Sequence, residues 1–258
     1  MTAARQRRKR GATATREPKS GDATSLDGYL GSDPTRPTVA VELVILTIRD
    51  ADLKVLLVDR AEPALKGAWA LPGGLVRIGP TPKSQGESLD DAAQRQLAEK
   101  THLPNGSCYL EQLYTFGAPG RDPRTRVISV AYFALLRAEL MPLVTVGVDT
   151  ERIAWFSIES ELPCLALDHG EILQTAIERI QGKIDFSPIA FSLVPETFTA
   201  TELREVHEAI KGRRYDAPNF RRRFRRMLED GILEQAPGYR VSGQRGGRPA
   251  QVYRFRRG

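Results

Sequence analysis

The alternation of apolar and polar positions divides the chain into two parts. The N-terminal part, which we call the front domain, mixes expected strands and helices, and the C-terminal part, the back domain, is smaller. Two β-rich runs, 39–48 and 54–60, flank a short polar link and predict an antiparallel hairpin. From Ser88 to Lys100 apolar residues recur at helical spacing, and Ser88 with Asp91 resembles a capping box. This mixture predicts an α/β sandwich. Its other expected elements are strands at 109–116, 127–136 and 153–156 and a helix at 170–181.

The pattern changes after a Pro-containing joint at 186–194. A helix is expected over 199–210, because Thr199 and Glu202 are spaced as a capping box and Gly212 stands where a helix stops. The order of helix, turn, helix, strand, Gly-rich loop and strand is that of a winged helix-turn-helix. The remaining elements of this series are a helix over 217–230 and short strands over 232–234 and 251–255.

Composition marks off a third region at the N-terminus. Residues 1–37 contain hardly any large apolar residue, which predicts a disordered basic tail. This tail either has no binding role or contacts DNA phosphates. The expected domains are therefore this tail, an α/β domain over 38–186 and a winged helix over 187–258. No apolar run reaches the ~18 residues that a membrane-spanning helix needs. Cys108 and Cys164 make neither a disulfide framework nor a zinc site, and both are expected to be buried.

The net charge of +6 is unevenly distributed along the chain. Residues 189–258 carry +7 and residues 1–38 carry +4, whereas residues 39–188 carry −5. An acidic middle beside a basic C-terminal end indicates that only the end meets a polyanion. The alternative is an arginine-rich face that is merely solvated.

The basic segment 219–228 has the arrangement of a recognition helix. Phe220, Phe224 and either Met227 or Leu228 form an apolar stripe, which leaves arginines on the outer faces. Arginine pairs bidentately with guanine and asparagine with adenine, so the first-turn residues are expected nearest the base edges and later arginines on phosphate. The first-turn residues are Asn219, Arg222 and Arg223, and the other candidates are Arg221, Arg225 and Arg226.

The loop between the last two strands reads Arg-Gly-Gly-Arg-Pro over 245–249. Its glycines let the backbone approach DNA, and Arg245 and Arg248 can enter the minor groove or clamp phosphate. A flexible loop on a protein-binding domain is the alternative. RNA is a second alternative, although the segment shows no aromatic stacking platform. Double-stranded DNA is the predicted partner.

A motif in the front domain resembles the Nudix hydrolase box. Residues 69–76 read Trp-Ala-Leu-Pro-Gly-Gly-Leu-Val, and Glu87 is followed after seven residues by 95–103, Arg-Gln-Leu-Ala-Glu-Lys-Thr-His-Leu. The sequence departs from the pattern in its length, because 80–86 stand as an insertion. It departs in chemistry as well, because Gln96, Lys100 and His102 replace the pattern's Glu, Glu and Gly.

These departures bear on catalysis. Mg²⁺ needs several oxygen ligands, yet only Glu87 and Glu99 remain, and Lys100 puts a cation where the metal would bind. No catalytic residue and no metal ligand are therefore predicted, and the chain is expected not to be an enzyme. The alternative is an active Nudix pyrophosphatase whose C-terminal domain tethers it to nucleic acid. His102 is expected at a helix end.

A site that has lost its chemistry can keep its shape and bind a nucleotide. An arginine suits phosphate and a glycine pair permits close backbone approach, whereas Trp69 is as plausible in the core. The loop 117–126 forms either a ligand wall or a solvated turn. The candidate ligand-binding residues are Arg60, Trp69, Pro72, Gly73, Gly74, Arg121 and Arg126.

A degenerate Nudix domain followed by this winged helix resembles the Nudix-related transcriptional regulator family, NrtR, over 38–258. The resemblance is carried by the altered box and by 69–74, 121–124, 130–134, 198–203, 219–222 and 247–254. It implies a Nudix-like α/β/α sandwich and a homodimeric, cytoplasmic repressor of NAD biosynthesis or salvage genes on a palindromic operator. It also implies that ADP-ribose, or a related NAD-derived nucleotide, is the effector that releases DNA, without any cofactor.

Overall fold

The computed structural model describes residues 37–60, 67–79, 85–104, 106–145, 150–241 and 249–256, with the side chains of 60, 150 and 151 outside the description. The tail expected over 1–37 falls outside these residues apart from Pro37. In the part of the chain that is described, no helix is long and apolar enough to cross a membrane.

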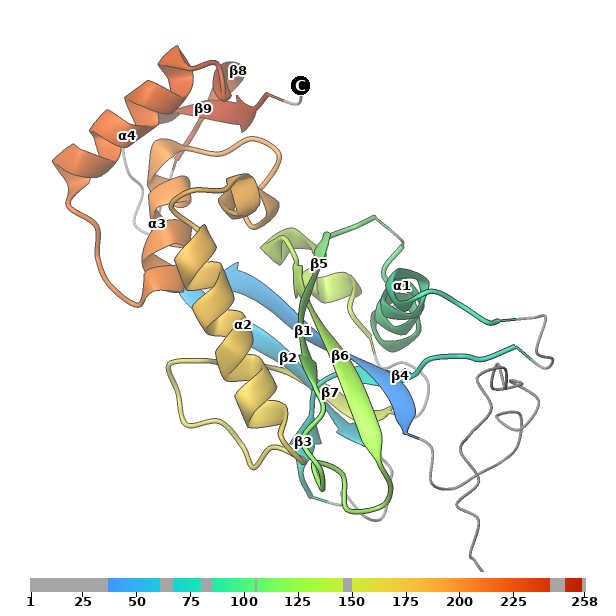
Figure 1. Ribbon diagram of the computed structural model, residues 1–258. Helices are drawn as coiled ribbons and strands as arrows, with labels where there is room; N and C mark the ends of the chain where they lie inside the picture. The colour runs from blue at the N-terminus through green and yellow to red at the C-terminus, as the bar shows by residue number, and fades with distance from the viewer. Residues whose placement is uncertain are drawn as a thin grey trace, which may run out of the picture. The chain divides into compact units, whose positions relative to one another are not determined.

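A seven-stranded sheet forms the centre of the front domain (Figure 1). Its strand order is β3-β2-β1-β6-β5, with β4 added to β1 and β7 added to β2. The pairing of β1 with β6 is parallel and the other pairings are antiparallel. The strands are β1 (Thr38–Arg49), β2 (Asp52–Arg60), β3 (Trp69–Ala70), β4 (Gly73–Leu75), β5 (Tyr109–Phe116), β6 (Val127–Leu135) and β7 (Thr150–Ser157).

The expected hairpin of β1 and β2 is confirmed, with Leu46 opposite Val55 and Arg49 opposite Asp52. Its turn holds Asp50 at φ 57° and Ala51 at φ 58°. A two-residue turn with positive φ at both positions matches the twist of antiparallel strands. The turn thus fixes the register of the first two strands.

Helices cover both faces of the sheet, which confirms the α/β/α sandwich (Figure 1). Side chains of a strand alternate between the faces, so Leu43 and Ile45 pack on the side of α1 while Val44 and Leu46 pack on the side of α2. All four side chains are fully buried. The helical elements of this domain are α1 (Leu89–Thr101), the 3₁₀ helix η3 (Ala138–Leu143) and α2 (His169–Lys183).

The back domain is a winged helix-turn-helix. The predicted capping box is present: the Thr199 backbone N–H donates to Glu202 Oε2 at 2.7 Å, and the Glu202 N–H donates to Thr199 Oγ1 at 3.2 Å. Such a cap stabilises a helix by about 1 kcal/mol. Gly212 ends the helix at φ 62°. The elements are η4 (Pro188–Ser192), α3 (Ala200–Lys211), α4 (Ala217–Glu229), β8 (Leu233–Arg240) and β9 (Ala250–Phe255).

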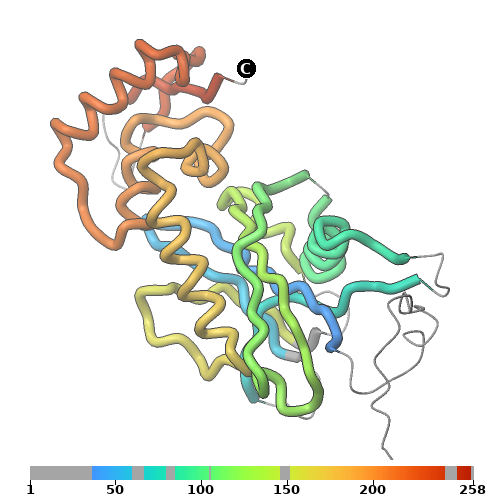
Figure 2. The backbone as a smooth tube through the Cα atoms, in the orientation of Figure 1, coloured from blue at the N-terminus to red at the C-terminus, as the bar shows by residue number. Residues whose placement is uncertain are grey.

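A continuous apolar cluster joins the two domains. Ile180 and Ile184 at the end of α2, Ile189 of η4 and Leu203 of α3 belong to one buried core. The side-chain amide of Gln181 also donates to the Ile210 carbonyl at 2.9 Å. The backbone trace accordingly shows α3 beside the end of α2 (Figure 2). The winged helix is therefore packed onto the front domain.

Candidate DNA-binding and nucleotide-binding sites

Helix α4 begins at a polar cap and docks through an apolar stripe. The Asp216 carboxylate accepts a hydrogen bond from the Asn219 backbone N–H at 3.0 Å and starts the helix. Phe220 and Phe224 are buried, and Phe224 meets the ring of Tyr253 from β9 at 4.8 Å. This docking directs the opposite side of α4 away from the domain.

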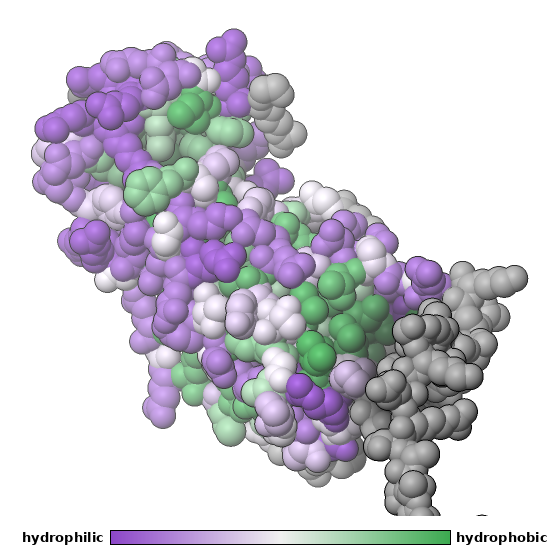
Figure 3. Space-filling model, viewed as in Figure 1, coloured by the Kyte–Doolittle hydropathy of each residue, from purple (hydrophilic) through white to green (hydrophobic). Residues whose placement is uncertain are grey.

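The outer side of α4 presents basic side chains. Arg221, Arg222, Arg225 and Arg226 are exposed, as is Asn219 in the first turn. No carboxylate among the described residues lies within ion-pair distance of these four guanidinium groups. Hydrophilic residues accordingly line the outer edge of this end of the molecule in Figure 3, beside a patch of hydrophobic residues. Guanidinium groups without an internal acid can bind phosphate or base edges.

The structure differs from the expectation at Arg223. Its guanidinium donates to Asp185 Oδ1 at 2.7 Å and to the Asp185 carbonyl at 2.8 Å. Relative to Phe220, position 223 is i+3 on the apolar stripe, so the helix turns this side chain inward. Arg223 is thus half-buried and engaged by Asp185 in this conformation, and the stripe contained the signal that would have turned it inward.

Two further segments lie beside the recognition helix. Arg213 and Arg214, in the turn between α3 and α4, are exposed and were not predicted, although the turn of a helix-turn-helix adjoins its recognition helix. Strands β8 and β9 pair as the expected wing. The predicted contacts Arg245 and Arg248 lie outside the described residues.

The altered Nudix box forms a closed ion-pair network at the start of α1. Arg95 donates to both carboxylates that remain, at 2.8 Å to Glu87 Oε2 and at 2.9 Å to Glu99 Oε2. Arg77 donates to Glu99 Oε1 at 2.8 Å, and its backbone N–H donates to Glu87 Oε1 at 2.7 Å. The hydrogen bonds from Arg95, above all, lower the pKa of Glu87 to about 2.

The insertion leaves this geometry intact. The Glu87 backbone N–H donates to the Arg77 carbonyl at 3.1 Å, so the chain departs after Arg77 and returns at the same point. Gly86 has φ +97° there, and a Cβ on it would lie 2.2 Å from the Arg77 carbonyl oxygen. Glycine is therefore required where the insertion closes. Residues 80–84 lie outside the description.

The replaced positions suit this network better than they suit a metal ion. Gln96 is buried, and one orientation of its amide donates to the Gly73 carbonyl at 3.2 Å and accepts from Arg95 at 2.9 Å. An ionised Glu at this position would lack the donor. Only Glu87 and Glu99 remain of the carboxylates of the box, and both already accept hydrogen bonds from guanidinium groups, so too few oxygen ligands are present to fit Mg²⁺. The described residues contain no group of three His, Cys, Asp or Glu that could hold a metal ion.

The segment expected to hold a nucleotide is tightly integrated in the core. A Cβ on Gly73 would lie 2.3 Å from a Glu42 carboxylate oxygen, and one on Gly74 would lie 2.4 Å from the Gln96 amide. Pro72 is buried. Internal packing thus explains both glycines. Trp69 packs edge-on against Phe156 with ring centroids 4.9 Å apart.

One face of Trp69 carries a cation that the sequence did not reveal. The guanidinium of Arg152 lies 5.3 Å from the ring centroid and also donates to Asp59 at 2.9 Å. A guanidinium over an indole can form a cation–π interaction and still present donors to an anion. Trp69 therefore takes part in the core while one face meets an exposed arginine. Of Arg60, only the backbone position at the end of β2 is described.

The loop 117–126 matches neither expectation fully. Arg121 is buried, and its guanidinium donates to Asp168 at 2.7 Å and to Ser129 at 3.1 Å. This placement corrects the expectation that it lines a ligand wall, because its donors face inward. Arg126 is exposed but donates to the Gly117 and Ala118 carbonyls at 2.8 Å and 3.0 Å, which closes the loop.

Three smaller expectations also meet the structure. His102 caps α1 at φ 58°, which confirms it as a helix-end residue. Cys108 is half-buried, and burial raises the pKa of its thiol to about 11. Cys164 is exposed, so the prediction that both cysteines are buried was wrong for this residue. It lies in an irregular segment between β7 and α2, where no periodicity indicates burial.

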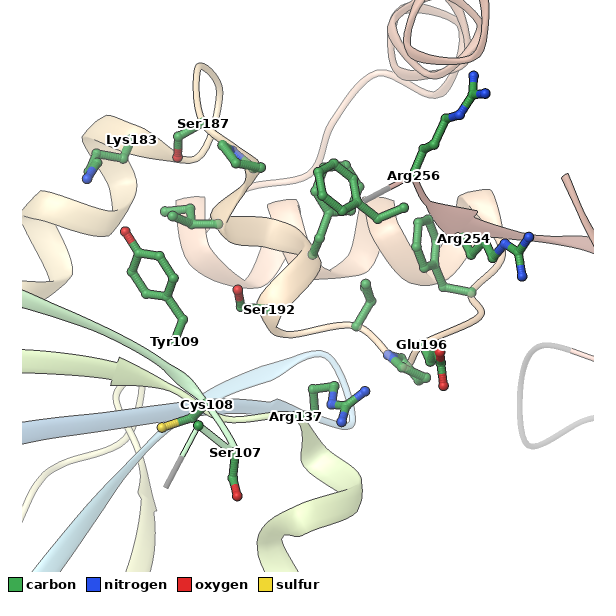
Figure 4. A pocket seen from close by; sticks show the side chains of 18 of the residues that line it. Ser107, Cys108, Tyr109, Arg137, Lys183, Ser187, Ser192, Glu196, Arg254 and Arg256 are labelled. Atoms are coloured by element: carbon green, nitrogen blue, oxygen red, sulfur yellow. The ribbon is translucent and has the colours of Figure 1, made fainter. Parts of the chain in front are cut away.

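An open pocket lies between the start of β5 and the segment around η4 and β9 (Figure 4). Its volume is about 980 Å³. None of the predicted ligand residues lines it. Its basic side chains face internal acids: Lys183 binds Glu111 at 2.6 Å and Arg254 binds Glu234 at 2.5 Å. The pocket therefore offers little unmatched positive charge, and we do not assign the nucleotide to it.

Two family models match this chain. One described as the NUDIX domain matches residues 38–176, and one described as the NrtR DNA-binding winged helix domain matches residues 190–255. Together with the fold, these matches define the class of protein as a Nudix domain followed by a DNA-binding winged helix.

Similar proteins narrow this class. The "ADPR responsive transcriptional repressor NtrR" of Acinetobacter baylyi is 35% identical over 237 residues, which are 92% of this chain and 89% of that protein. The structure of Shewanella oneidensis NrtR complexed with a 27mer DNA has a TM-score of 0.67 and 31% identity and covers 84% of this chain and 93% of its own. An ADP-ribose pyrophosphatase of Methanocaldococcus jannaschii is 34% identical over 139 residues, 54% of this chain and 72% of that protein. The chain belongs to the NrtR family of Nudix-related transcriptional regulators.

Proposed function

We propose that this protein is a DNA-binding transcriptional repressor of NAD biosynthesis or salvage genes. The observation that carries the proposal is α4, which buries Phe220 and Phe224 and leaves four arginines exposed without a described acidic partner. The relative from Shewanella oneidensis was crystallised with DNA, and its chain matches 84% of this one. The proposed DNA contacts are Asn219, Arg221, Arg222, Arg225 and Arg226 of α4 with Arg245 and Arg248 of the wing.

The effector that releases the DNA is ADP-ribose or a related NAD-derived nucleotide, bound in the front domain. The Acinetobacter baylyi relative is named for its response to ADPR. The binding surface includes Trp69, the segment 72–74, Arg60 and Arg126, with Arg121 as an internal support of the loop. We place the boundary between this domain and the DNA-binding domain at 186/187, and we place the protein in the cytoplasm.

The protein acts as a homodimer on a palindromic operator. Two recognition helices on one face of DNA contact half-sites about 34–36 Å apart, so a dimer sets the spacing of its two copies of α4. A nucleotide that binds more tightly to a dimer of another spacing would release the operator.

The front domain binds its nucleotide without hydrolysing it. Arg95 and Arg77 occupy the carboxylates that a divalent ion would need, and Lys100 adds a cation. The second candidate function is an active pyrophosphatase. It is favoured by an alignment that covers 54% of this chain with an ADP-ribose pyrophosphatase. Release of AMP from ADP-ribose with Mg²⁺ by the purified protein would establish that candidate.

A band-shift experiment tests the main proposal. The full chain is mixed with promoter DNA from NAD-metabolism genes, with and without ADP-ribose, and AMP serves as the control nucleotide. Specific binding that ADP-ribose relieves is the expected result. Specific DNA binding that does not change with ADP-ribose would exclude ADP-ribose as the effector but would still support a DNA-binding repressor. Folded protein without sequence-specific binding would overturn the proposal.

A further inference from the structure

Asp185, just beyond the C-terminus of α2, binds three parts of the winged helix at once. Its carboxylate accepts hydrogen bonds from Arg223 of α4 at 2.7 Å and from the Tyr215 hydroxyl at 2.8 Å, and it pairs with Lys211 of α3 at 2.8 Å. Burial raises the pKa of this carboxyl, but the three donors outweigh burial and hold the pKa below its usual range. These four residues form what we call the Asp185 cluster.

A buried histidine packs against the cluster without adding charge to it. His207 of α3 lies 3.9 Å from the Asp185 carboxylate and is fully buried beside the rings of Tyr215 and Phe220. Burial, with a smaller contribution from Arg223, lowers the pKa of His207 to about 4. The imidazole is therefore neutral near pH 7. The charge of Asp185 is balanced by Lys211 and Arg223, which belong to the two helices of the DNA-binding domain.

The opposite end of α2 is bonded to the front domain. The carboxylate of Asp168, which precedes the helix, accepts hydrogen bonds from the buried guanidinium of Arg121 in the loop 117–126. His169 Nδ1 accepts a hydrogen bond from the Leu71 backbone N–H at 2.9 Å. Leu71 directly precedes the segment 72–74. The start of α2 is thus attached to two of the segments proposed to meet the nucleotide.

The body of α2 is bonded to the sheet along its length. Ile172, Ala176 and Ile180 are fully buried in the core beneath the sheet. Arg179 donates to the Leu113 carbonyl of β5 at 3.0 Å, and Lys183 binds Glu111 of the same strand. A helix of this length spans about 22 Å at 1.5 Å per residue. The helix therefore connects the two segments at its start with the Asp185 cluster beyond its end.

We propose that α2 couples the nucleotide site to the recognition helix, and that Asp185 is the positioning residue through which it holds α4. Among the described residues, Arg223 is the one side chain of α4 that bonds to α2 or to the turn after it. This inference rests on the proposed function, because it needs a nucleotide that weakens DNA binding. A ligand acts across this distance only if both sites bias one element with two arrangements.

The test compares coupling, not affinity alone. A duplex selected from random DNA by the wild-type protein is titrated by fluorescence anisotropy, with and without saturating ADP-ribose. The readout is a ratio: the Kd for DNA measured with ADP-ribose divided by the Kd measured without it. Asp185→Asn keeps the size of the side chain and removes its charge, so we expect this ratio to fall at least fivefold. Calorimetric affinity for ADP-ribose without DNA should change less than twofold.

Two companion variants make the result decisive. Arg223→Gln removes the bond to α4 and keeps the pair of Asp185 with Lys211, so it should lower the ratio as well, even where Asp185→Asn fails to fold. Arg240→Gln is the matched control: it breaks an ion pair with Glu202 at 3.1 Å inside the winged helix and does not touch α2. Its ratio should equal that of the wild type.

The outcomes separate this inference from the proposed function. A wild-type ratio of one would exclude ADP-ribose as the effector, leave the DNA-binding repressor standing, and overturn the inference, which needs a nucleotide that weakens DNA binding. A wild-type ratio above one that Arg223→Gln leaves unchanged would overturn the inference alone. Equal lowering by Arg240→Gln would also overturn it, because a general loosening of the winged helix would then explain the effect.

Discussion

Helices α1 and α4 are both 13 residues long and both begin at a side-chain cap, but the one arginine of α1 and the outer arginines of α4 serve opposite purposes. In α1, Arg95 is only 16% exposed and bonds to Glu87 and Glu99. In α4, the four outer arginines meet no acid among the described residues. An arginine that is paired with an internal acid stabilises the fold, whereas an arginine without such a partner is available to bind an external polyanion.

Arg223 sharpens this comparison within a single helix. It sits among the exposed arginines of α4 in the sequence, but it behaves as Arg95 does in α1 because Asp185 accepts its hydrogen bonds. The number of arginines in a helix therefore overstates the number that can reach DNA.

The largest expected effect comes from the open arginines. Replacing Arg221, Arg222, Arg225 and Arg226 together by Gln should weaken operator binding roughly 1,000-fold or more, because the variant can neither neutralise phosphates nor read bases with this helix. Arg222→Ala alone should cost about 1–3 kcal/mol if the residue reads a base. Anisotropy titrations over a range of salt concentrations measure both, and the salt slope should fall by about 0.9 for each phosphate that is no longer neutralised. An unchanged affinity would show that these residues do not bind DNA.

The next effect concerns the paired arginine of α1. Arg95→Gln leaves Glu87 and Glu99 partly buried without their main partner and should destabilise the fold by about 2–3 kcal/mol. Arg225→Gln in α4 should change stability by no more than about 0.5 kcal/mol. Urea denaturation of both variants supplies the measurement. Equal destabilisation would break the distinction between the two helices.

His207 of α3, which packs against Phe220 of α4, predicts a dependence of stability on pH. The folded pKa of His207 is about 4, below its ordinary value of 6.5, so the unfolded chain binds the extra proton between these values. Stability from this residue is present above pH 6.5 and is lost as the pH falls toward 4, on the order of 3 kcal/mol. His207→Gln should lose this part of the slope when unfolding is followed at several pH values. If the free energy of unfolding depends on pH with the same slope in the variant and the wild type, the predicted contribution of His207 is wrong.

The smallest effect tests the closed network of the Nudix box. Lys100→Glu removes a cation and adds a possible ligand, so adding Mg²⁺ at about 10 mM should raise the Tm of this variant by about one degree through mass action. The wild type should show no Mg²⁺-dependent shift and no turnover of ADP-ribose. Lys100→Gln serves as the control, since it removes the charge without adding a carboxylate. Turnover by the wild type would refute the interpretation of Arg95 as a residue that blocks the metal.

Most of the fold was predictable from local pattern. The hairpin, the two sandwich helices, the capping box at Thr199 and the apolar stripe through Phe220 and Phe224 were expected and are confirmed. These features depend on neighbours within a few residues, which periodicity records. The short strands β3 and β4 were not expected, because two or three residues are too few to show a period.

The sequence by itself determined which way α4 faces, since the spacing of its phenylalanines fixes the buried side. Only the tertiary structure decided which acid each engaged arginine meets. Arg223 and its acceptor Asp185 are 38 residues apart, and Arg121 and Asp168 are 47 residues apart. An ion pair depends on distance in space, and no local periodicity relates positions so far apart. The same physical reason makes the Asp185 cluster visible only after the winged helix has packed onto the end of α2.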